Sequence, residues 1–167
     1  MHITELNTLS AEQAQSELFK CCGSTRWAKT LAEERPFSDL NTLLLRSDAV
    51  WAACGEADGL EAFTHHPKIG DLKSLEKKFS TTKEWAGGEQ GGINHADASI
   101  LRDLAAGNSA YEQKFGFIFI VCATGKSATE MLDLLNARLG NDPAAELKIA
   151  MIEQNKITRL RLEKLIA

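Results

Sequence analysis

One apolar run constrains what this chain can fold into. Residues 115–123 read Phe-Gly-Phe-Ile-Phe-Ile-Val-Cys-Ala, which is short, apolar and aromatic, as a buried strand would be. No second run of comparable strength is available to pair with it, and a lone strand has no ladder partner. We therefore expect this run to be an extended or irregular segment, buried among helices in an all-α fold.

Helical signals fill most of the remaining chain. Serines that can cap a helix precede apolar-periodic stretches, and glycine or proline follows them. These signals predict helices over 11–22, 25–34, from Ser38 to Gly55, 57–63, from Asn94 or Asp97 to about Lys114, 128–139 and from near Pro143 onward, with a further short helix possible over 71–79. A length of 167 residues is enough for one domain with a real core, so we expect a single compact domain over residues 1–167.

Charge and composition exclude several classes of function. The net charge of -4 gives no general affinity for nucleic acid, and no apolar run is long enough to span a bilayer. The first residues lack the pattern of a signal peptide, so we expect a cytoplasmic protein in which all four cysteines are reduced thiols.

The segment most suited to catalysis is Thr64-His65-His66-Pro67-Lys68-Ile69-Gly70-Asp71, which holds two imidazoles, a proline, a cation, a glycine and a carboxylate within eight positions. Pro67 fixes its own φ and disfavours helix at His66, so a helix running to Phe63 should end near the histidines. Gly70 permits a second change of direction. A histidine on a rigid bend suits a general acid or base. The alternative is a helix-ending loop with solvent-facing histidines, and the local pattern alone favours it slightly.

Other constellations are weaker. Gly125-Lys126-Ser127 resembles the end of a phosphate-binding loop, but position 120, where that motif needs glycine, is isoleucine, so a helix start capped by Ser127 is the better interpretation. The histidines and nearby carboxylates match no metal-site spacing, and we expect no metal site. Two further groups could bind a ligand or remain solvated: the glycine-bracketed pair Glu89-Gln90, and the arginines Arg138, Arg159 and Arg161.

Taken in order along the chain, these residues resemble the family of 2-oxo-4-hydroxy-4-carboxy-5-ureidoimidazoline (OHCU) decarboxylases, enzymes of urate breakdown. The matching segments are Arg35-Pro36-Phe37, 48–51, 66–71, Glu89-Gln90, 115–119, Lys156-Ile157 and 160–162. The resemblance covers nearly the whole chain. It implies an all-helical fold, a homodimer, no cofactor, and decarboxylation of OHCU to (S)-allantoin. The alternative from another class is a helical module that binds a small anion or a partner protein without turnover.

The resemblance also implies the site. His66 would be the catalytic proton donor, with Glu89 to orient it or to hold the ureido group of the substrate. The substrate would contact Pro67, Ala86, Gly87, Gly88, Glu89, Gln90, Phe119, Ile120, Val121, Cys122, Ala123 and Arg161, with Arg159 as the less favoured arginine. Many relatives have serine at Ala86 and a basic residue at Thr124, which Lys126 could replace. Backbone groups of 119–123, if unpaired in a sheet, could bind the ring amides.

Overall fold

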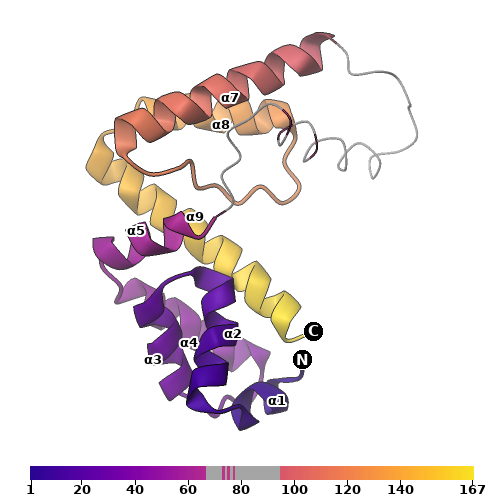
Figure 1. Cartoon of the computed structure of the whole chain (residues 1–167), viewed down its shortest axis with the longest axis vertical. Coiled ribbons are helices and arrows are strands. Elements are labelled where there is room, and N and C mark those ends of the chain that lie inside the picture. Colours follow the sequence, from indigo (N-terminus) through magenta and orange to yellow (C-terminus); the bar gives the residue numbers. More distant parts are fainter. Residues whose placement is uncertain (67–72, 74, 76, 78–94) are drawn as a thin grey trace, which may run out of the picture. The chain divides into compact units, whose positions relative to one another are not determined.

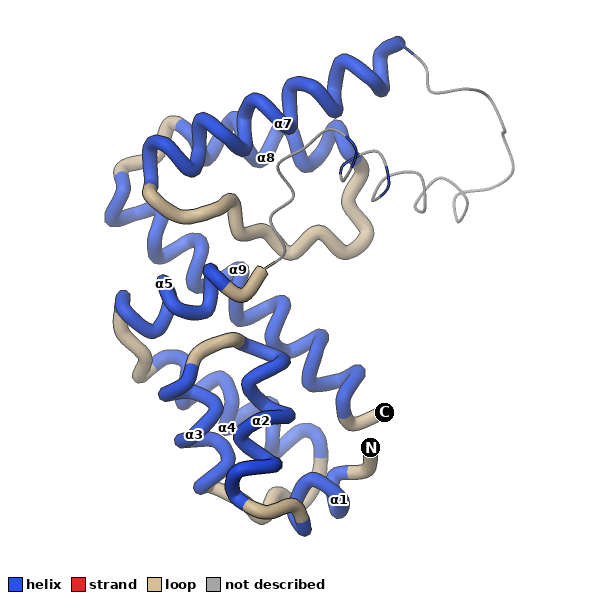
Figure 2. Tube along the Cα trace, viewed as in Figure 1, coloured by secondary structure: helices blue, strands red, loops and turns tan. Residues whose placement is uncertain are grey.

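The computed structural model describes residues 1–66, 73, 75, 77 and 95–167. Within these ranges every regular element is a helix, and no strand is present (Figure 2). The helices are α1 (Ile3–Thr8), α2 (Ala11–Cys22), α3 (Thr25–Glu33), α4 (Leu40–Ala52), α5 (Glu56–Thr64), α7 (His95–Phe115), α8 (Ala128–Leu139) and α9 (Pro143–Leu165), labelled in Figure 1. The expectation of an all-α fold is confirmed.

Local capping explains most helix starts. The Ser10 and Ser127 hydroxyls accept the backbone N–H groups of Gln13 and Glu130, and both form reciprocal capping boxes. Ser24 caps α3 through the N–H of Trp27. The Ser127 bond confirms the interpretation of Gly125-Lys126-Ser127 as a helix start rather than a phosphate loop.

Two predicted boundaries were wrong. The cap of α4 is Asp39, whose carboxylate accepts the N–H of Thr42 at 2.7 Å, and Ser38 only supports that carboxylate. Gly55 does not close α4, which ends at Ala52, but instead caps α5. Of the two candidate caps of the next helix, Asp97 lies inside α7, which begins at His95, and Asn94 lies outside the described residues.

The chain divides into two compact units. Unit 1 contains residues 1–66, 120–122 and 147–167, and unit 2 contains 67–119 and 123–146, so α9 contributes residues to both. The single domain over 1–167 stays a prediction. Neither unit has a helix, among the residues described, with the length and apolarity needed to cross a bilayer.

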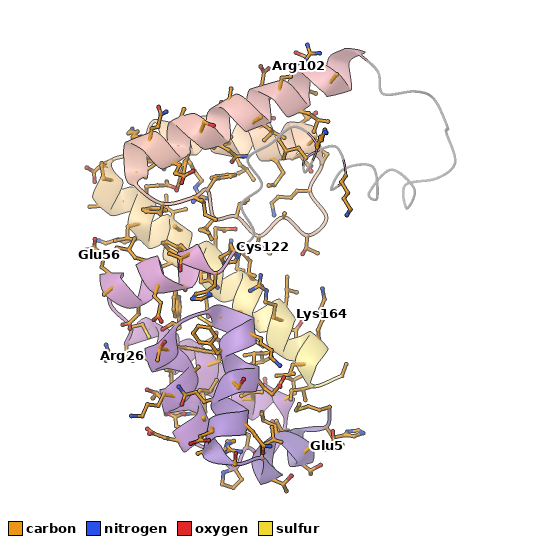
Figure 3. The ribbon with its side chains drawn as sticks, viewed as in Figure 1. Glu5, Arg26, Glu56, Arg102, Cys122 and Lys164 are labelled. Carbon is orange, nitrogen blue, oxygen red and sulfur yellow. The ribbon has the colours of Figure 1, made fainter. Side chains whose placement is uncertain are left out.

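Unit 1 is built around buried side chains from α1 to α4 and from the second half of α9 (Figure 3). The indole of Trp27 donates to the Ser47 carbonyl, and that of Trp51 donates to the Met151 carbonyl at 3.0 Å. Gly59 of α5 lets Met151 come close, since a Cβ there would lie 3.1 Å from its sulfur. These contacts hold α4 and α5 against α9.

The arrangement of α7 and α8 explains why residues 116–127 form a long connection without helix or strand. Gly107 of α7 packs on Leu135 of α8, and further along both helices Lys114 donates to the Leu139 carbonyl at 2.6 Å. The two helices are therefore parallel, whereas a tight turn would join antiparallel helices. The connection must return along the length of α8, so an extended chain with no ladder partner is what this topology requires. The prediction of an extended or irregular segment over 115–123 is confirmed, except that Phe115 still belongs to α7 and that, within the segment, Ile120 alone is buried.

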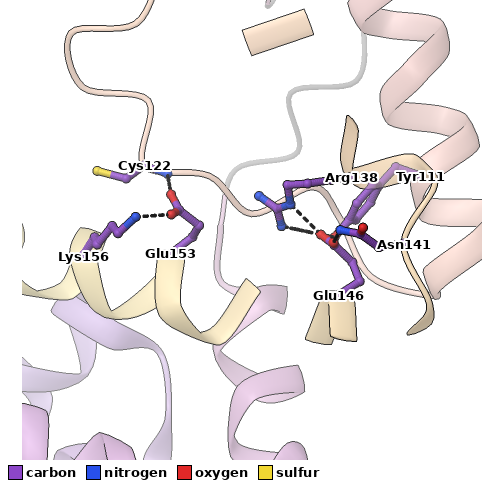
Figure 4. Close-up of polar contacts among 7 residues, drawn as sticks. All are labelled: Tyr111, Cys122, Arg138, Asn141, Glu146, Glu153 and Lys156. Carbon is purple, nitrogen blue, oxygen red and sulfur yellow. Dashed lines mark hydrogen bonds and ion pairs between the residues drawn. The ribbon is translucent and has the colours of Figure 1, made fainter. Parts of the chain in front are cut away.

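A polar cluster completes unit 2 (Figure 4). It consists of the buried Tyr111, Arg138 and Glu146 and the half-buried Asn141. Arg138 pairs with Glu146, whose carboxylate also accepts from Tyr111 at 2.5 Å and from Asn141 at 2.9 Å. The Arg138 guanidinium also lies 4.6 Å from the ring centroid of Phe119. Arg138, an anion-binding candidate in the sequence, is thus committed to a buried carboxylate.

Candidate active site

The candidate active site begins where α5 ends. The N–H groups of His65 and His66 still bond to the carbonyls of Ala62 and Phe63, at 3.1 and 3.4 Å, so the helix unwinds through the histidine pair. The predicted end of the helix at this bend is confirmed.

Gly23 and Phe19 hold the bend from the other side. Gly23 ends α2 in the left-handed region at φ 83°, and a Cβ at this position would lie 2.8 Å from the Cβ of His65. The His65 ring packs edge-on against Phe19, with centroids 4.9 Å apart. The close fit fixes His65 against α2 and leaves the ring of His66 to be directed elsewhere.

His66 turns its ring toward α9. Its Nε2 lies 2.5 Å from Oε1 of Gln154, a fully buried side chain. The amide nitrogen of Gln154 donates to the Thr158 hydroxyl at 3.2 Å and to the Cys22 carbonyl at 3.4 Å. His66 is half-buried, and the amide that contacts it is itself held by two hydrogen bonds from its nitrogen.

The pKa of His66 is lowered from its ordinary value, chiefly because burial disfavours the charged ring. The Arg161 cation and the neighbouring His65 act in the same direction, and the bond to Gln154 opposes them. The ring is therefore neutral at pH 7 and holds a lone pair that can accept a proton.

The two arginines of the final helix have different surroundings. Arg161 follows Gln154 by two helical turns, donates to the Cys21 carbonyl at 3.4 Å and acts electrostatically on His66. Arg159 instead pairs with Asp48 of α4 at 2.5 Å. No carboxylate in the described part of the chain pairs with Arg161.

The segment 120–122 belongs to the same unit as His66. Ile120 is buried, while Val121 and Cys122 are half-buried. The backbone N–H of Cys122 donates at 2.8 Å to Glu153, which also pairs with Lys156 (Figure 4). The hypothesis that this backbone is free to bind a ligand is therefore wrong for this N–H, because Glu153 occupies it.

The remaining predicted site residues are distributed as follows. Phe119 and Ala123 are half-buried and belong to unit 2. Pro67, Ala86, Gly87, Gly88, Glu89 and Gln90 lie outside the described residues. In the part of the chain that is described, no group of histidine, cysteine and carboxylate side chains is arranged to hold a metal ion.

Sequence reasoning missed Gln154 and Glu153. The sequence carries no clear signal for Gln154, because only the structure shows that residues 146, 150, 154, 158 and 162, which recur every four positions along α9, are all buried. Three of the five are polar, whereas the apolar Ile152 on the same helix is 59% exposed. Polar residues on a buried helical stripe indicate specific partners.

Comparison with known proteins identifies the family. The model of the OHCU decarboxylase family matches residues 7–163. This chain belongs to the OHCU decarboxylase family. A relative from Arabidopsis thaliana, "Uric acid degradation bifunctional protein TTL", is 36% identical over 95% of this chain. The chain spans 49% of the length of that relative.

Solved structures agree with this assignment. The crystal structure of an OHCU decarboxylase in the presence of (S)-allantoin matches with a TM-score of 0.71 and 37% identity, covering 90% of this chain and 97% of that one. A structure of (S)-allantoin synthase matches with a TM-score of 0.73 and 19% identity over 99% of this chain and 54% of its own. The second likeness supports the fold alone.

Proposed function

We propose that this protein removes carbon dioxide from OHCU and yields (S)-allantoin, without a cofactor. Family membership and the likeness to an OHCU decarboxylase solved with (S)-allantoin support this function. The observation that carries it is the pair formed by His66 and Gln154: a neutral, half-buried imidazole held by a buried amide, close to the cation of Arg161.

The proposed reaction has three steps. The bond from the ring carbon to the carboxylate breaks, and its electron pair enters the conjugated ring, where a ring nitrogen takes a proton from water. The hydroxyl on the same carbon then gives up its proton and becomes a carbonyl. The neighbouring carbon, which bears the ureido group, must receive a proton on one face only to give a single enantiomer.

One side chain can both remove the hydroxyl proton and protonate the carbon that bears the ureido group. In this proposal, His66 accepts the hydroxyl proton on its free nitrogen and returns it to the carbon bearing the ureido group. A positioned acid or base contributes about a hundredfold to ten-thousandfold. Its lowered pKa keeps His66 neutral before the reaction, which the accepting step requires.

Arg161 supplies charge. A guanidinium without a carboxylate partner in the described chain can bind a substrate anion or carbonyl. Arg159 is neutralised by Asp48 and is the poorer candidate. The roles of Glu89, Gln90 and the other proposed contacts rest on the family resemblance alone, with Glu89 proposed to orient His66 or to hold the ureido group.

The experiment uses product chirality. OHCU is generated in place from urate with urate oxidase and the hydrolase that follows it, and circular dichroism follows the product. We expect rapid formation of optically active (S)-allantoin with this protein. Racemic product at the spontaneous rate would refute the proposal and favour a binding module.

Neighbouring residues provide matched controls. His66→Ala should abolish stereospecific turnover, whereas His65→Ala, which removes only the ring packed on Phe19, should retain it. Arg161→Gln should impair turnover and Arg159→Gln should not. If His66→Ala is as active as His65→Ala, His66 has no role in the mechanism. If Arg161→Gln is as active as Arg159→Gln, the same holds for Arg161.

We also propose a homodimer in the cytoplasm. The family resemblance supports the dimer, and the four free thiols are compatible with a reducing compartment. Light scattering coupled to gel filtration gives the mass, and a monomer at assay concentrations would refute the dimer. Fractionation of the source cells, with the protein followed by antibody, tests the location.

A further inference from the structure

The amide of Gln154 has an orientation that its partners dictate. One end of it faces the carbonyl of Cys22 at 3.4 Å, and a carbonyl oxygen can only accept a hydrogen bond. The end facing Cys22 must therefore be the NH₂ group, and the carbonyl oxygen of the amide must point toward His66.

The contacts of Thr158 are compatible with the same orientation. Its hydroxyl donates its only hydrogen to the backbone carbonyl of Gln154, one turn earlier, at 3.0 Å. The same hydroxyl can then only accept at its second contact, 3.2 Å from the side-chain nitrogen of Gln154. A flipped amide would bring two oxygens, both acceptors only, face to face at the Cys22 carbonyl.

This orientation fixes a hydrogen on His66. The Gln154 oxygen, 2.5 Å from Nε2, accepts and cannot donate, so Nε2 must carry the hydrogen in both the neutral and the charged ring. In the neutral ring the lone pair is then on Nδ1. No hydrogen bond joins Nδ1 to any residue that the structure describes.

We propose that Gln154 is a positioning residue that holds His66 as the Nε2–H tautomer, so that Nδ1 is the nitrogen that exchanges protons with the substrate. The tautomer follows from contacts within unit 1, whereas the role of Nδ1 rests on the proposed decarboxylation. Among described residues, the charged or titratable groups acting on His66 are Arg161, which lies on α9 with Gln154, and the neighbouring His65.

The test measures the tautomer of His66 and the turnover of OHCU in two separate experiments. Nitrogen-15 labelled histidine in the full chain reports which ring nitrogen carries the hydrogen, and His66→Asn identifies the His66 signals among the four histidines. We expect Nε2–H, slow to exchange with water, at a pH where the ring is neutral. The coupled OHCU assay then gives kcat and KM for each variant.

Three variants give the contrast. Gln154→Met keeps the length of the side chain and removes the acceptor. Gln154→Glu keeps an acceptor toward His66, since its protonated form can donate to Cys22. Asn155→Ala, which affects the adjacent residue bonded to Asp48 on α4, is the control for any disturbance of α9.

We expect Gln154→Met to speed exchange of the His66 Nε2–H and to lower kcat by about tenfold to a hundredfold, with KM changed less than about twofold. Gln154→Glu should recover part of kcat, and Asn155→Ala should match the parent. If Gln154→Met does not fold, Thr158→Val takes its place. This variant removes one of the two hydrogen-bond partners of the Gln154 amide nitrogen, so it should also lower kcat, by a smaller factor.

Two results would overturn the inference. One is a neutral His66 with its hydrogen on Nδ1. The other is a folded Gln154→Met variant with the parent kcat, which would reduce Gln154 to a structural residue. If the parent protein shows no turnover of OHCU, the proposed function fails by itself, and the nitrogen-15 measurement still decides the tautomer.

Discussion

Replacing Gly23 with alanine tests how the end of α2 fixes the histidine bend. The variant places a Cβ on a residue at φ 83°, which costs about 1–2 kcal/mol for an L-residue in the left-handed region. The new Cβ would also lie 2.8 Å from the His65 Cβ and 3.3 Å from the Ala62 carbonyl. Overpacking of this kind costs about 1–3 kcal/mol. The sum is a loss of about 2–5 kcal/mol, a large share of the about 5–15 kcal/mol typical of a domain.

Urea unfolding followed by tryptophan fluorescence measures this loss. In a Trp85→Phe background the two remaining tryptophans, Trp27 and Trp51, both report on unit 1. Gly140→Ala is the control, because Gly140 also ends a helix but has φ -79° and its added Cβ would meet nothing closer than 3.7 Å. Since Gly140 belongs to unit 2, circular dichroism of the helices follows its unfolding and that of Gly23→Ala alongside the fluorescence. That control should be neutral or stabilising by about 0.4–1 kcal/mol.

A second background separates the two costs. His65→Gly removes both His65 atoms that the new Cβ would meet, so Gly23→Ala should then cost only about the 1–2 kcal/mol of the left-handed backbone. A loss below about 0.5 kcal/mol for Gly23→Ala in the parent chain would refute the reasoning, since that is within the range of ordinary surface substitutions.

Other outcomes follow from the same structure. Glu146→Gln leaves Arg138 buried without its carboxylate, at a cost of about 3–5 kcal/mol, so calorimetry should show a Tm lower by about 6–20 °C, and an unchanged Tm would contradict the ion pair. The folded-state pKa of His66 is below its ordinary value of 6.5, so the unfolded chain binds a proton at this residue more readily than the folded one. The stability that His66 contributes above pH 6.5 is therefore lost as pH falls through the folded pKa. Urea titrations at several pH values should show this fall in the free energy of unfolding for the parent protein and not for His66→Asn. Burial raises the pKa of Cys22 to about 12, so about one Cys22 thiol in ten thousand is ionised at pH 8. Mass spectrometry should therefore find iodoacetamide on Cys22 only after unfolding. Rapid labelling of Cys22 in the folded protein would contradict this prediction.

Local chemistry made much of the fold predictable from sequence. A serine cap and its reciprocal partner lie three residues apart, so the starts of α2 and α8 are readable without the rest of the chain. Where two candidates adjoin, as Ser38 and Asp39 do, the sequence does not say which one binds the helix N–H. α1 escaped prediction because it has six residues and a histidine rather than a serine or aspartate at its start.

The candidate site was predictable only in part, because its contacts are long-range. Pro67 and the two histidines indicate a bend, but nothing near them indicates that His66 is bonded to a residue 88 positions later. The same applies to Glu153, which binds a backbone N–H 31 positions earlier. Such pairs depend on how α2, α5 and α9 pack, which a periodicity argument does not reveal.

The distance along the chain between His66 and Gln154 also has a consequence during protein synthesis. A ribosome adds about 5–20 residues per second, so the 88 residues between them take about 4–18 s to make. Through that interval α2, α4 and α5 exist without Met151, Gln154 and Leu162, which later pack against them or complete their core. The newborn chain therefore exposes Trp51 and the incomplete core for seconds, an opportunity for chaperones, and the histidine gains its partner only when α9 is made.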